Sequence, residues 1–138
     1  MKEKKTKIAV SAFVIKDGKF LLLKRNNPPK EWGPPAGRVQ EGEILADAVK
    51  RETKEEANID IKILVPINLW SGKHEGEMLF SIGILCEYVS GEIRSSKEHS
   101  EARWFSIKEL KNEKITHDIK DFIRAEKIKA LFDSDRIE

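Results

Sequence analysis

The sequence lacks the features of a disulfide-stabilised or membrane-spanning protein. A single cysteine, Cys86, excludes an intramolecular disulfide and favours a reducing compartment, so we expect a cytoplasmic protein. No apolar run reaches the roughly 18 residues of a membrane-spanning helix, and no membrane partner is expected. Residues 8–15 are apolar, but no small-residue cleavage site follows them, so we interpret them as a strand rather than a signal segment.

The sequence also has no large excess of charge of one sign. With 26 basic and 24 acidic residues the formal net charge is +2, which produces no overall field that favours nucleic acid, so a nucleic-acid partner is not expected. The three histidines, His74, His99 and His117, have no ligand-like spacing. With only one cysteine beside them, the sequence contains no zinc motif.

Repeats, linkers and low-complexity tracts are absent as well. A chain of 138 residues with 39% hydrophobic residues can bury one substantial core. We therefore expect a single domain over residues 1–138, with a frayed start at 1–6 and a loose tail at 133–138.

The most informative feature that is present is a predicted helix near the middle of the chain. No proline interrupts residues 43–57, and apolar residues such as Leu45 and Val49 recur there at the spacing of one amphipathic face. Gly42 can serve as the N-terminal cap of the helix, and Asn58 is suited to end it in a left-handed conformation. We expect about four helical turns.

Acidic residues occupy an unusual face of this helix. At about 100° per residue, Glu52 and Glu56 continue the apolar stripe and Glu55 flanks it, so we expect these three acids to turn inward; a merely solvated cluster should lie opposite the stripe. Two such carboxylates about 4 Å apart repel each other by about 4 kcal/mol at an effective dielectric of about 20. Arg51 can pair with Glu55, but one guanidinium cannot neutralise three carboxylates. Divalent cations could, so the pattern indicates a metal-dependent phosphate site.

The same residues resemble the Nudix box, G-x(5)-E-x(7)-R-E-U-x-E-E-x-G-U, where U is aliphatic. The match runs from Gly37 to Ile59 and retains every charged position. Thr53 replaces an aliphatic residue and Asn58 replaces the last glycine; both changes are mild, because Thr53 keeps a methyl group and asparagine tolerates positive φ. The resemblance implies an α/β fold, the Nudix-type α/β/α sandwich with a mixed β-sheet, a central Nudix-box helix and a C-terminal helix.

The resemblance also implies an activity. It implies a Mg²⁺-dependent hydrolase, with Mn²⁺ as a substitute, in which water attacks phosphorus and splits the diphosphate bridge of a nucleoside diphosphate linked to a group X. Oxygen ligands of this kind suit Mg²⁺. The implied metal ligands are Gly37, through its carbonyl, and Glu52, Glu55 and Glu56. The implied catalytic residues are Arg51, which orients a glutamate, Glu52, Glu55 and Glu98, while Glu43 is expected to be structural.

Several alternatives stay open. Family members take the general base either from the box helix or from a later loop, where Glu98 is our preferred candidate and Glu101 the other; a solvated loop acid is the alternative for both. The group X is undefined, since a nucleoside triphosphate, a nucleotide sugar, a dinucleotide and a capped RNA share the same bridge. A non-catalytic nucleotide-sensing module on the same fold and a structural Ca²⁺ site are alternative functions. The resemblance also allows a homodimer.

Side chains that could bind a nucleotide are less well defined. Trp32, Trp70 and Phe80 could stack on a nucleobase, although each is also a candidate for the core. Lys24 and Arg25 lie at the end of the second predicted strand and could reach phosphates, although solvated strand ends are the alternative.

The remaining pattern predicts a sheet around the helix. The expected strands are 8–15, 19–24, 61–69, 77–89 and 103–105. Asp17-Gly18 predicts a hairpin, and Pro66 indicates an edge or a bulge. A capping box over 106–109 predicts a brief helix, and a C-terminal helix is expected from about Thr116, with Ala130 and Leu131 on its apolar face.

Overall fold

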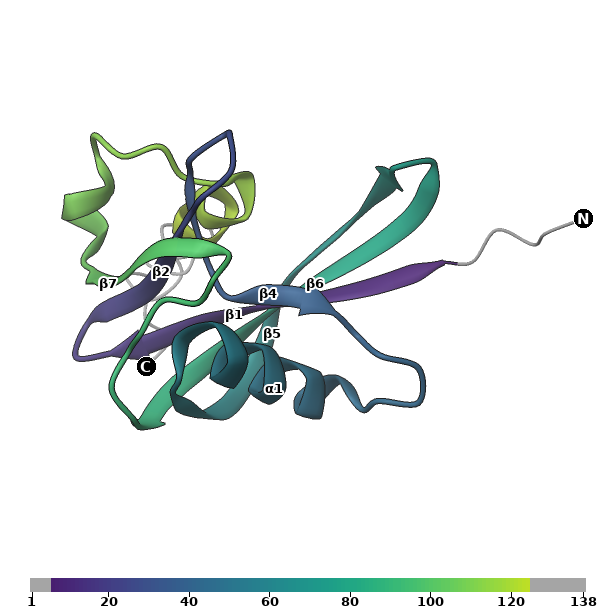
Figure 1. Cartoon of the computed structure of the whole chain (residues 1–138), viewed down its shortest axis with the longest axis horizontal. Helices are drawn as coiled ribbons and strands as arrows, with labels where there is room; N and C mark the ends of the chain where they lie inside the picture. Colours follow the sequence, from purple (N-terminus) through teal and green to yellow (C-terminus); the bar gives the residue numbers. More distant parts are fainter. Residues whose placement is uncertain (1–5, 125–138) are drawn as a thin grey trace, which may run out of the picture.

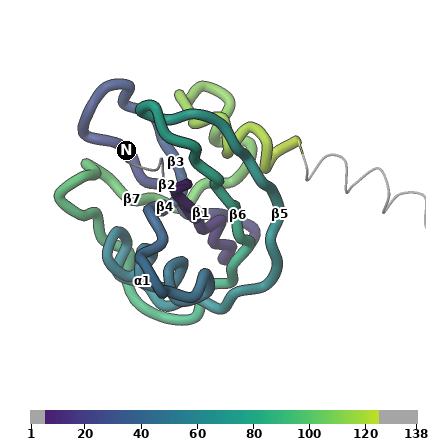
Figure 2. The backbone as a smooth tube through the Cα atoms, turned by 90° about the vertical axis from the view of Figure 1, so that its right-hand side faces the viewer, coloured from purple at the N-terminus to yellow at the C-terminus, as the bar shows by residue number. Residues whose placement is uncertain are grey.

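A computed structural model describes residues 6–124 of the chain. In this part of the chain, one mixed sheet is packed between the helix α1 on one face and the segment that ends the described chain on the other (Figures 1 and 2). Its elements are β1 (Lys7–Lys16), β2 (Lys19–Arg25), β3 (Trp32–Gly33), β4 (Ala36–Arg38), α1 (Leu45–Ala57), β5 (Asp60–His74), β6 (Glu77–Ser90), β7 (His99–Phe105) and the 3₁₀ helix η1 (Ile107–Leu110).

The sheet is built around strand β1. Its order is β3-β2-β1-β6-β5, while β4 also pairs with β1 and β7 with β2. The β1–β6 pair is parallel and the other pairs are antiparallel, so the predicted mixed sheet is confirmed. The predicted hairpin is also confirmed: Asp17 and Gly18 both have positive φ, as a tight turn between β1 and β2 requires.

Alternating side chains of β1 supply two separate cores. Val10, Ala12 and Val14 pack toward α1, together with Ala48 and Val49 of that helix. Phe13 points to the opposite face and stacks on Phe122 with ring centroids 5.0 Å apart. Because both faces of β1 are covered, this strand has an almost continuous apolar sequence, as buried strands do.

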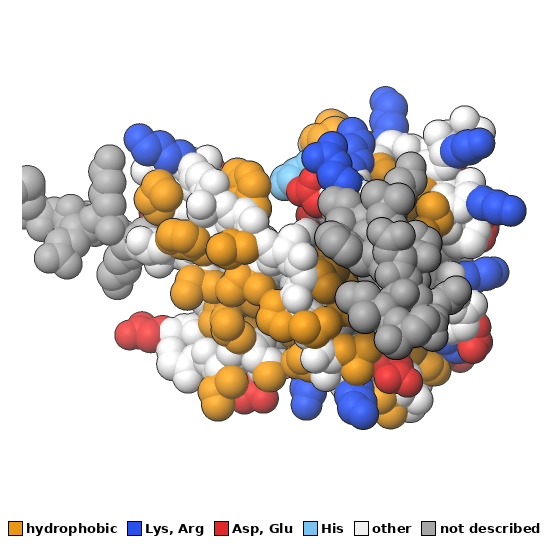
Figure 3. Space-filling view, turned by 180° about the vertical axis from the view of Figure 1, so that it is seen from behind, with side chains coloured by type: hydrophobic (Ala, Val, Ile, Leu, Met, Phe, Trp, Pro, Cys, Tyr) orange, Lys and Arg blue, Asp and Glu red, His pale blue; other side chains and the backbone are white. Residues whose placement is uncertain are grey.

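Strand β5 is longer than predicted and lies at the edge of the sheet. Its pairing with β6 shifts register between Ile63 and Val65 and between Pro66 and Asn68, so the expectation of an edge or bulge at Pro66 is confirmed. Exposed apolar residues on these two strands are Leu64, Val65, Leu69, Trp70, Met78, Phe80 and Val89. Figure 3 shows hydrophobic side chains gathered on the side of the molecule seen from behind.

The last described elements cover the second face of the sheet. The predicted capping box is present, with Ser106 and Glu109 bonding reciprocally at the start of η1, although the brief helix is of the 3₁₀ type. Residues 117–124 are helical, and Ile119 and Phe122 are buried there. Ala130, Leu131, the predicted loose tail and all but the last residue of the frayed start lie outside the described residues.

Cys86 is fully buried on β6. Burial raises the pKa of its thiol to about 12, so the thiolate that reacts as a nucleophile is not populated near neutral pH. Cys86 is therefore an inert thiol of the core. Among residues 6–124, no helix is both long and apolar enough to cross a membrane.

Candidate active site

The helix that carries the acidic residues begins and ends at positions set by local chemistry. It starts at Leu45 rather than at the predicted residue 43, because Gly42 adopts a φ of 77° in the preceding turn and is not the cap. It ends as predicted, with Asn58 in the left-handed conformation at a φ of 66°. Thr53 is buried, and its hydroxyl donates to the carbonyl of Val49 at 2.7 Å. Because this bond satisfies the hydroxyl within the helix, threonine is tolerated where the box usually has an aliphatic residue.

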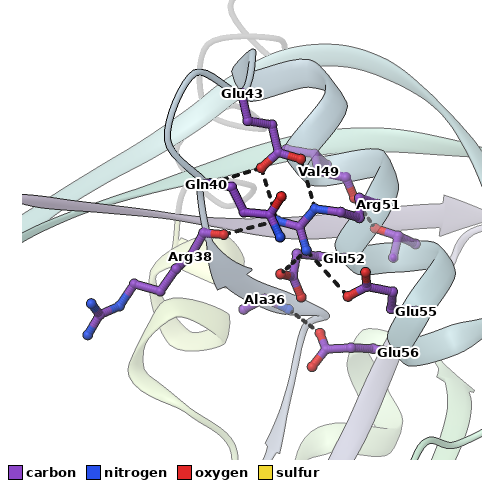
Figure 4. A network of polar contacts seen from close by, with 10 residues as sticks. Ala36, Arg38, Gln40, Glu43, Val49, Arg51, Glu52, Glu55 and Glu56 are labelled. Carbon is purple, nitrogen blue, oxygen red and sulfur yellow. Dashed lines mark hydrogen bonds and ion pairs between the residues drawn. The ribbon is translucent and has the colours of Figure 1, made fainter.

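Arg51 holds several carboxylates of the box in place (Figure 4). Its guanidinium donates two hydrogen bonds to Glu43, at 2.7 and 3.0 Å, one to Glu52 at 2.8 Å and a longer one to Glu55 at 3.3 Å. A further bond at 3.0 Å reaches the carbonyl of Arg38. The predicted pairing of Arg51 with Glu55 is present, but Glu43 is its principal partner and the larger cause of the raised pKa of Arg51. Glu43 thus fixes Arg51 on the helix surface.

We expect Glu43→Gln to reduce stability in a pH-dependent way. The hydrogen bonds from Arg51 lower the pKa of Glu43 to about 2, so the folded state favours the charged carboxylate. A lowered pKa contributes stability above the ordinary pKa of 4.5 and loses that contribution as the pH falls toward about 2. Urea denaturation should therefore find the variant less stable than the wild type at pH 6, with the difference shrinking by pH 2.5. A difference that is the same at both pH values would contradict this role.

Gly37 and Glu52 lie in unusually close contact. Strand β4 pairs with β1 through Gly37 and Val10, which brings the backbone of Gly37 under the carboxylate of Glu52. A Cβ atom added at Gly37 would lie 2.2 to 2.4 Å from the three carboxylate atoms of Glu52. The side chain of Glu52 is 14% exposed, and its burial raises its pKa. Only glycine leaves room for this carboxylate.

Glu56 is the most deeply placed of the acids, at 9% exposure. The backbone N–H of Ala36 donates to its carboxylate at 2.7 Å. Burial raises its pKa to about 8, and the negative charges of Glu52, Glu98 and Glu55 add to this effect, while the bond from Ala36 opposes it. The region holds more negative charge than its neighbours neutralise, which is the condition under which a cation binds.

The expectation that three acids turn inward is correct for two of them. Glu52 and Glu56 are enclosed, but the side chain of Glu55 is 57% exposed, because its position on the helix lies at the border of the apolar stripe. Within residues 6–124, no three Asp, Glu, His or Cys side chains converge closely enough to hold a metal ion. One oxygen of Glu52 is bonded to Arg51 and one of Glu56 to Ala36. The donors nevertheless fit a hard divalent cation, because all are oxygens and no cationic side chain among residues 6–124 forms an ion pair with Glu56.

A cleft of about 310 Å³ opens beside Glu56. Its lining residues are Leu23, Arg25, Gly33, Pro34, Ala36, Glu56, Glu98, His99, Thr116 and Asp118. A larger cavity of about 680 Å³ lies between the start of β1 and the loop before α1, but it contains none of the predicted metal ligands; its acids are Glu41 and Glu43, and Glu43 is bound to Arg51. The chemistry therefore points to the smaller cleft.

The two predicted candidates for a loop base have different positions. Glu98 lines the cleft with Glu56, while Glu101 lies on β7 opposite Lys24 and does not line the cleft. His99, to which the sequence assigned no role, also lines it, and burial lowers its pKa. Thr116 and Asp118 were not predicted as site residues, and no local pattern marks them, since they reach the cleft from a distant part of the chain.

The candidate aromatic residues also differ. Trp32 is 2% exposed and packs edge-on against Phe105, with centroids 4.7 Å apart, so it belongs to the core. Trp70 is 40% exposed and lies 6.0 Å from the ring of His117, which directly follows Thr116 of the cleft wall. Phe80 is 37% exposed on β6.

Comparison with known proteins agrees with this geometry. A family model described as the NUDIX domain matches residues 5–125. An ADP-ribose pyrophosphatase from Methanocaldococcus jannaschii is 31% identical over 85% of this chain and 73% of its own length. An asymmetrical bis(5'-nucleosyl)-tetraphosphatase from Sus scrofa is 33% identical over 65% of each chain. The crystal structure of a MutT protein from Methanosarcina mazei Go1 superposes with a TM-score of 0.77 at 28% identity, over 94% of this chain and 99% of that one.

The fold and the match place this protein among the hydrolases of pyrophosphate bonds, since relatives are named as pyrophosphatases and hydrolases. The chain belongs to the NUDIX family. The predicted family and α/β fold are thereby confirmed. The chain spans 73% of the archaeal relative but only 65% of the Sus scrofa enzyme and 26% of the putative nudix hydrolase 1 from Caenorhabditis elegans.

Proposed function

We propose that this protein is a Mg²⁺-dependent hydrolase that splits the diphosphate bridge of a nucleoside diphosphate linked to a further group. The observation that carries the proposal is the buried carboxylate of Glu56 at the wall of a cleft, which forms no ion pair with a cationic side chain of residues 6–124; burial first, and then the charges of Glu52 and Glu98, raise its pKa. Such a concentration of negative charge costs folding energy without a cation. We also place the activity in the cytoplasm, because the only cysteine is a free, buried thiol.

In this proposal the metal ligands are Glu52, Glu55, Glu56 and the carbonyl of Gly37. When bound, the divalent cations would neutralise phosphate charge and lower the pKa of a bound water. Arg51 contributes by orientation, because its guanidinium donates hydrogen bonds to both Glu52 and Glu55. Glu55 would reach the cation by leaving its long bond to Arg51, since its side chain is 57% exposed and has room to change rotamer.

We assign the general base to Glu98. Glu98 lines the same cleft as Glu56 of α1, and in this proposal its carboxylate accepts the proton of the attacking water as the new P–O bond forms and the bridging P–O bond breaks. The leaving phosphate oxygen departs with the bridge electrons. Arg25 lines the same cleft, and its positive charge would offset the negative charge of a substrate phosphate.

The experiment that tests the proposal is a substrate panel. Purified protein with Mg²⁺ or Mn²⁺ is incubated with ADP-ribose, a dinucleoside tetraphosphate and nucleoside triphosphates, and products are separated by ion-exchange chromatography. The names of two relatives favour the first two substrates, so we expect turnover of at least one of them and none in EDTA. Nucleotide binding without turnover across the panel would instead support a sensing module.

A further inference from the structure

The loop that carries Glu98 is a tight turn just before β7. The N–H of His99 donates to the carbonyl of Ser96 at 3.3 Å, which closes a turn with Lys97 and Glu98 at its centre. The hydroxyl of Ser96 also lies 3.4 Å from the N–H of Glu98 and 3.3 Å from Nδ1 of His99. The closing bond of a β-turn does not use the carbonyls of its two central residues, so these need partners from elsewhere.

Both of these carbonyls are bound by one residue from a distant part of the chain. The backbone N–H of Asn26 donates to the carbonyl of Glu98 at 3.1 Å, and its side-chain amide donates to the carbonyl of Lys97 at 2.6 Å. Asn26 directly follows β2, where the pairing with β7 shifts register between Lys24 and Arg25. Asn26 thus extends the pairing of β2 with β7 past this irregularity, first through its backbone N–H and then through its side-chain amide.

We propose that Asn26 is a positioning residue that, through the carbonyls of Lys97 and Glu98, holds the Glu98 carboxylate in the cleft against the acids of α1. This inference rests on the proposed role of Glu98 as general base. Without the side-chain bond the turn is still closed by Ser96, but its orientation on β2 is set by the single backbone bond from Asn26. Small displacements of a catalytic group reduce turnover strongly.

The variant that tests this is Asn26→Asp, which keeps the side-chain shape and the backbone N–H but removes the amide donor. We expect kcat to fall about tenfold while KM stays within about twofold, because binding groups are untouched. Asn27→Asp is the matched control: it adds the same charge at the adjacent exposed position, and we expect wild-type kinetics. Asn26→Ala removes the donor without adding charge and should reproduce the loss. Equal activity of the Asn26 variants and the Asn27 control would overturn the inference.

A double-mutant cycle separates positioning of Glu98 from a general structural effect. Glu98→Gln alone should lower kcat by about 100-fold, and Asn26→Asp should then cost less than about twofold in that background. The same tenfold cost in both backgrounds would refute the inference. If wild-type protein turns over substrate but Glu98→Gln is fully active, the base assignment and this inference both fail while the hydrolase proposal stands. If only the Asn26 variants are unaffected, the inference alone fails.

Discussion

Glu56→Gln should abolish most of the hydrolytic activity and at the same time leave a protein that is at least as stable as the wild type without metal. We expect turnover to fall by about 1,000-fold, because a neutral amide cannot hold a divalent cation against the substrate phosphates. The fold should persist, since a glutamine oxygen can still accept the hydrogen bond from Ala36. Steady-state kinetics with saturating Mg²⁺ measure the first effect.

The stability effect has a defined sign. The pKa of Glu56 in the folded protein is raised to about 8 from 4.5, so the charged carboxylate destabilises the folded state increasingly as the pH rises from about 4.5 to about 8. In EDTA at pH 8, Glu56→Gln should therefore melt at a higher temperature than the wild type, and the two should converge near pH 4.5. Added Mn²⁺ should raise the melting temperature of the wild type but not that of Glu56→Gln.

Glu41→Gln provides the control for this substitution. Glu41 is an exposed glutamate on the loop before α1, so its replacement removes one negative charge from the box without changing the cleft. We expect its kinetics, its melting temperature and its response to Mn²⁺ to match those of the wild type. If the Glu56→Gln protein kept the turnover of the wild type, Glu56 would not be a metal ligand.

Gly37→Ala should also eliminate most of the activity, by moving a different carboxylate. The new methyl group would occupy the space of the Glu52 carboxylate, at 2.2 Å from its carbon atom. Because that carboxylate is the far end of a flexible side chain, it can rotate away at little cost in stability. We expect kcat to fall by at least about 100-fold, given the sensitivity of catalysis to displaced groups, with a melting temperature within a few degrees of the wild type.

Gly76→Ala should show the opposite combination. Gly76 adopts a φ of 80° in the β5–β6 turn, where an alanine meets no atom within 4 Å but is conformationally strained. The cost is about 1 kcal/mol of stability, with activity unchanged because the turn does not contribute to the cleft. If Gly37→Ala lost stability and Gly76→Ala lost activity, the contact between Gly37 and Glu52 would not have the role given to it here.

The sequence predicted best those features that local periodicity determines. Helix α1 and its left-handed end at Asn58 follow from the spacing of apolar residues and from the tolerance of asparagine for positive φ. The inward direction of Glu52 and Glu56 follows from the same periodicity. The helix start was misplaced by two residues, because Glu43 bonds both to the backbone of Gln40 and to Arg51 and so belongs to the turn before the helix.

Features formed by segments that lie far apart along the chain could not be predicted from the sequence. The cleft combines Arg25 of β2, Glu56 of α1, Glu98 and Asp118, whose proximity depends on strand order and not on any spacing along the chain. A helical projection places Glu55 at the border of the apolar face, so it could not show how far this side chain is exposed. The bonds from Asn26 depend on a register shift between β2 and β7, for which the sequence carries no recognisable signal.

The parallel pairing of β1 with β6 has a consequence for how the chain acquires its structure. Val10 pairs with Ile82, and since about 70 residues separate them, a large loop must close before this central contact forms. The hairpin of β1 and β2 can form early, but on the ribosome the apolar strand β1 has to wait for β6 to be synthesised. We expect refolding to be slow for a chain of this size, with consolidation of the sheet as the late step.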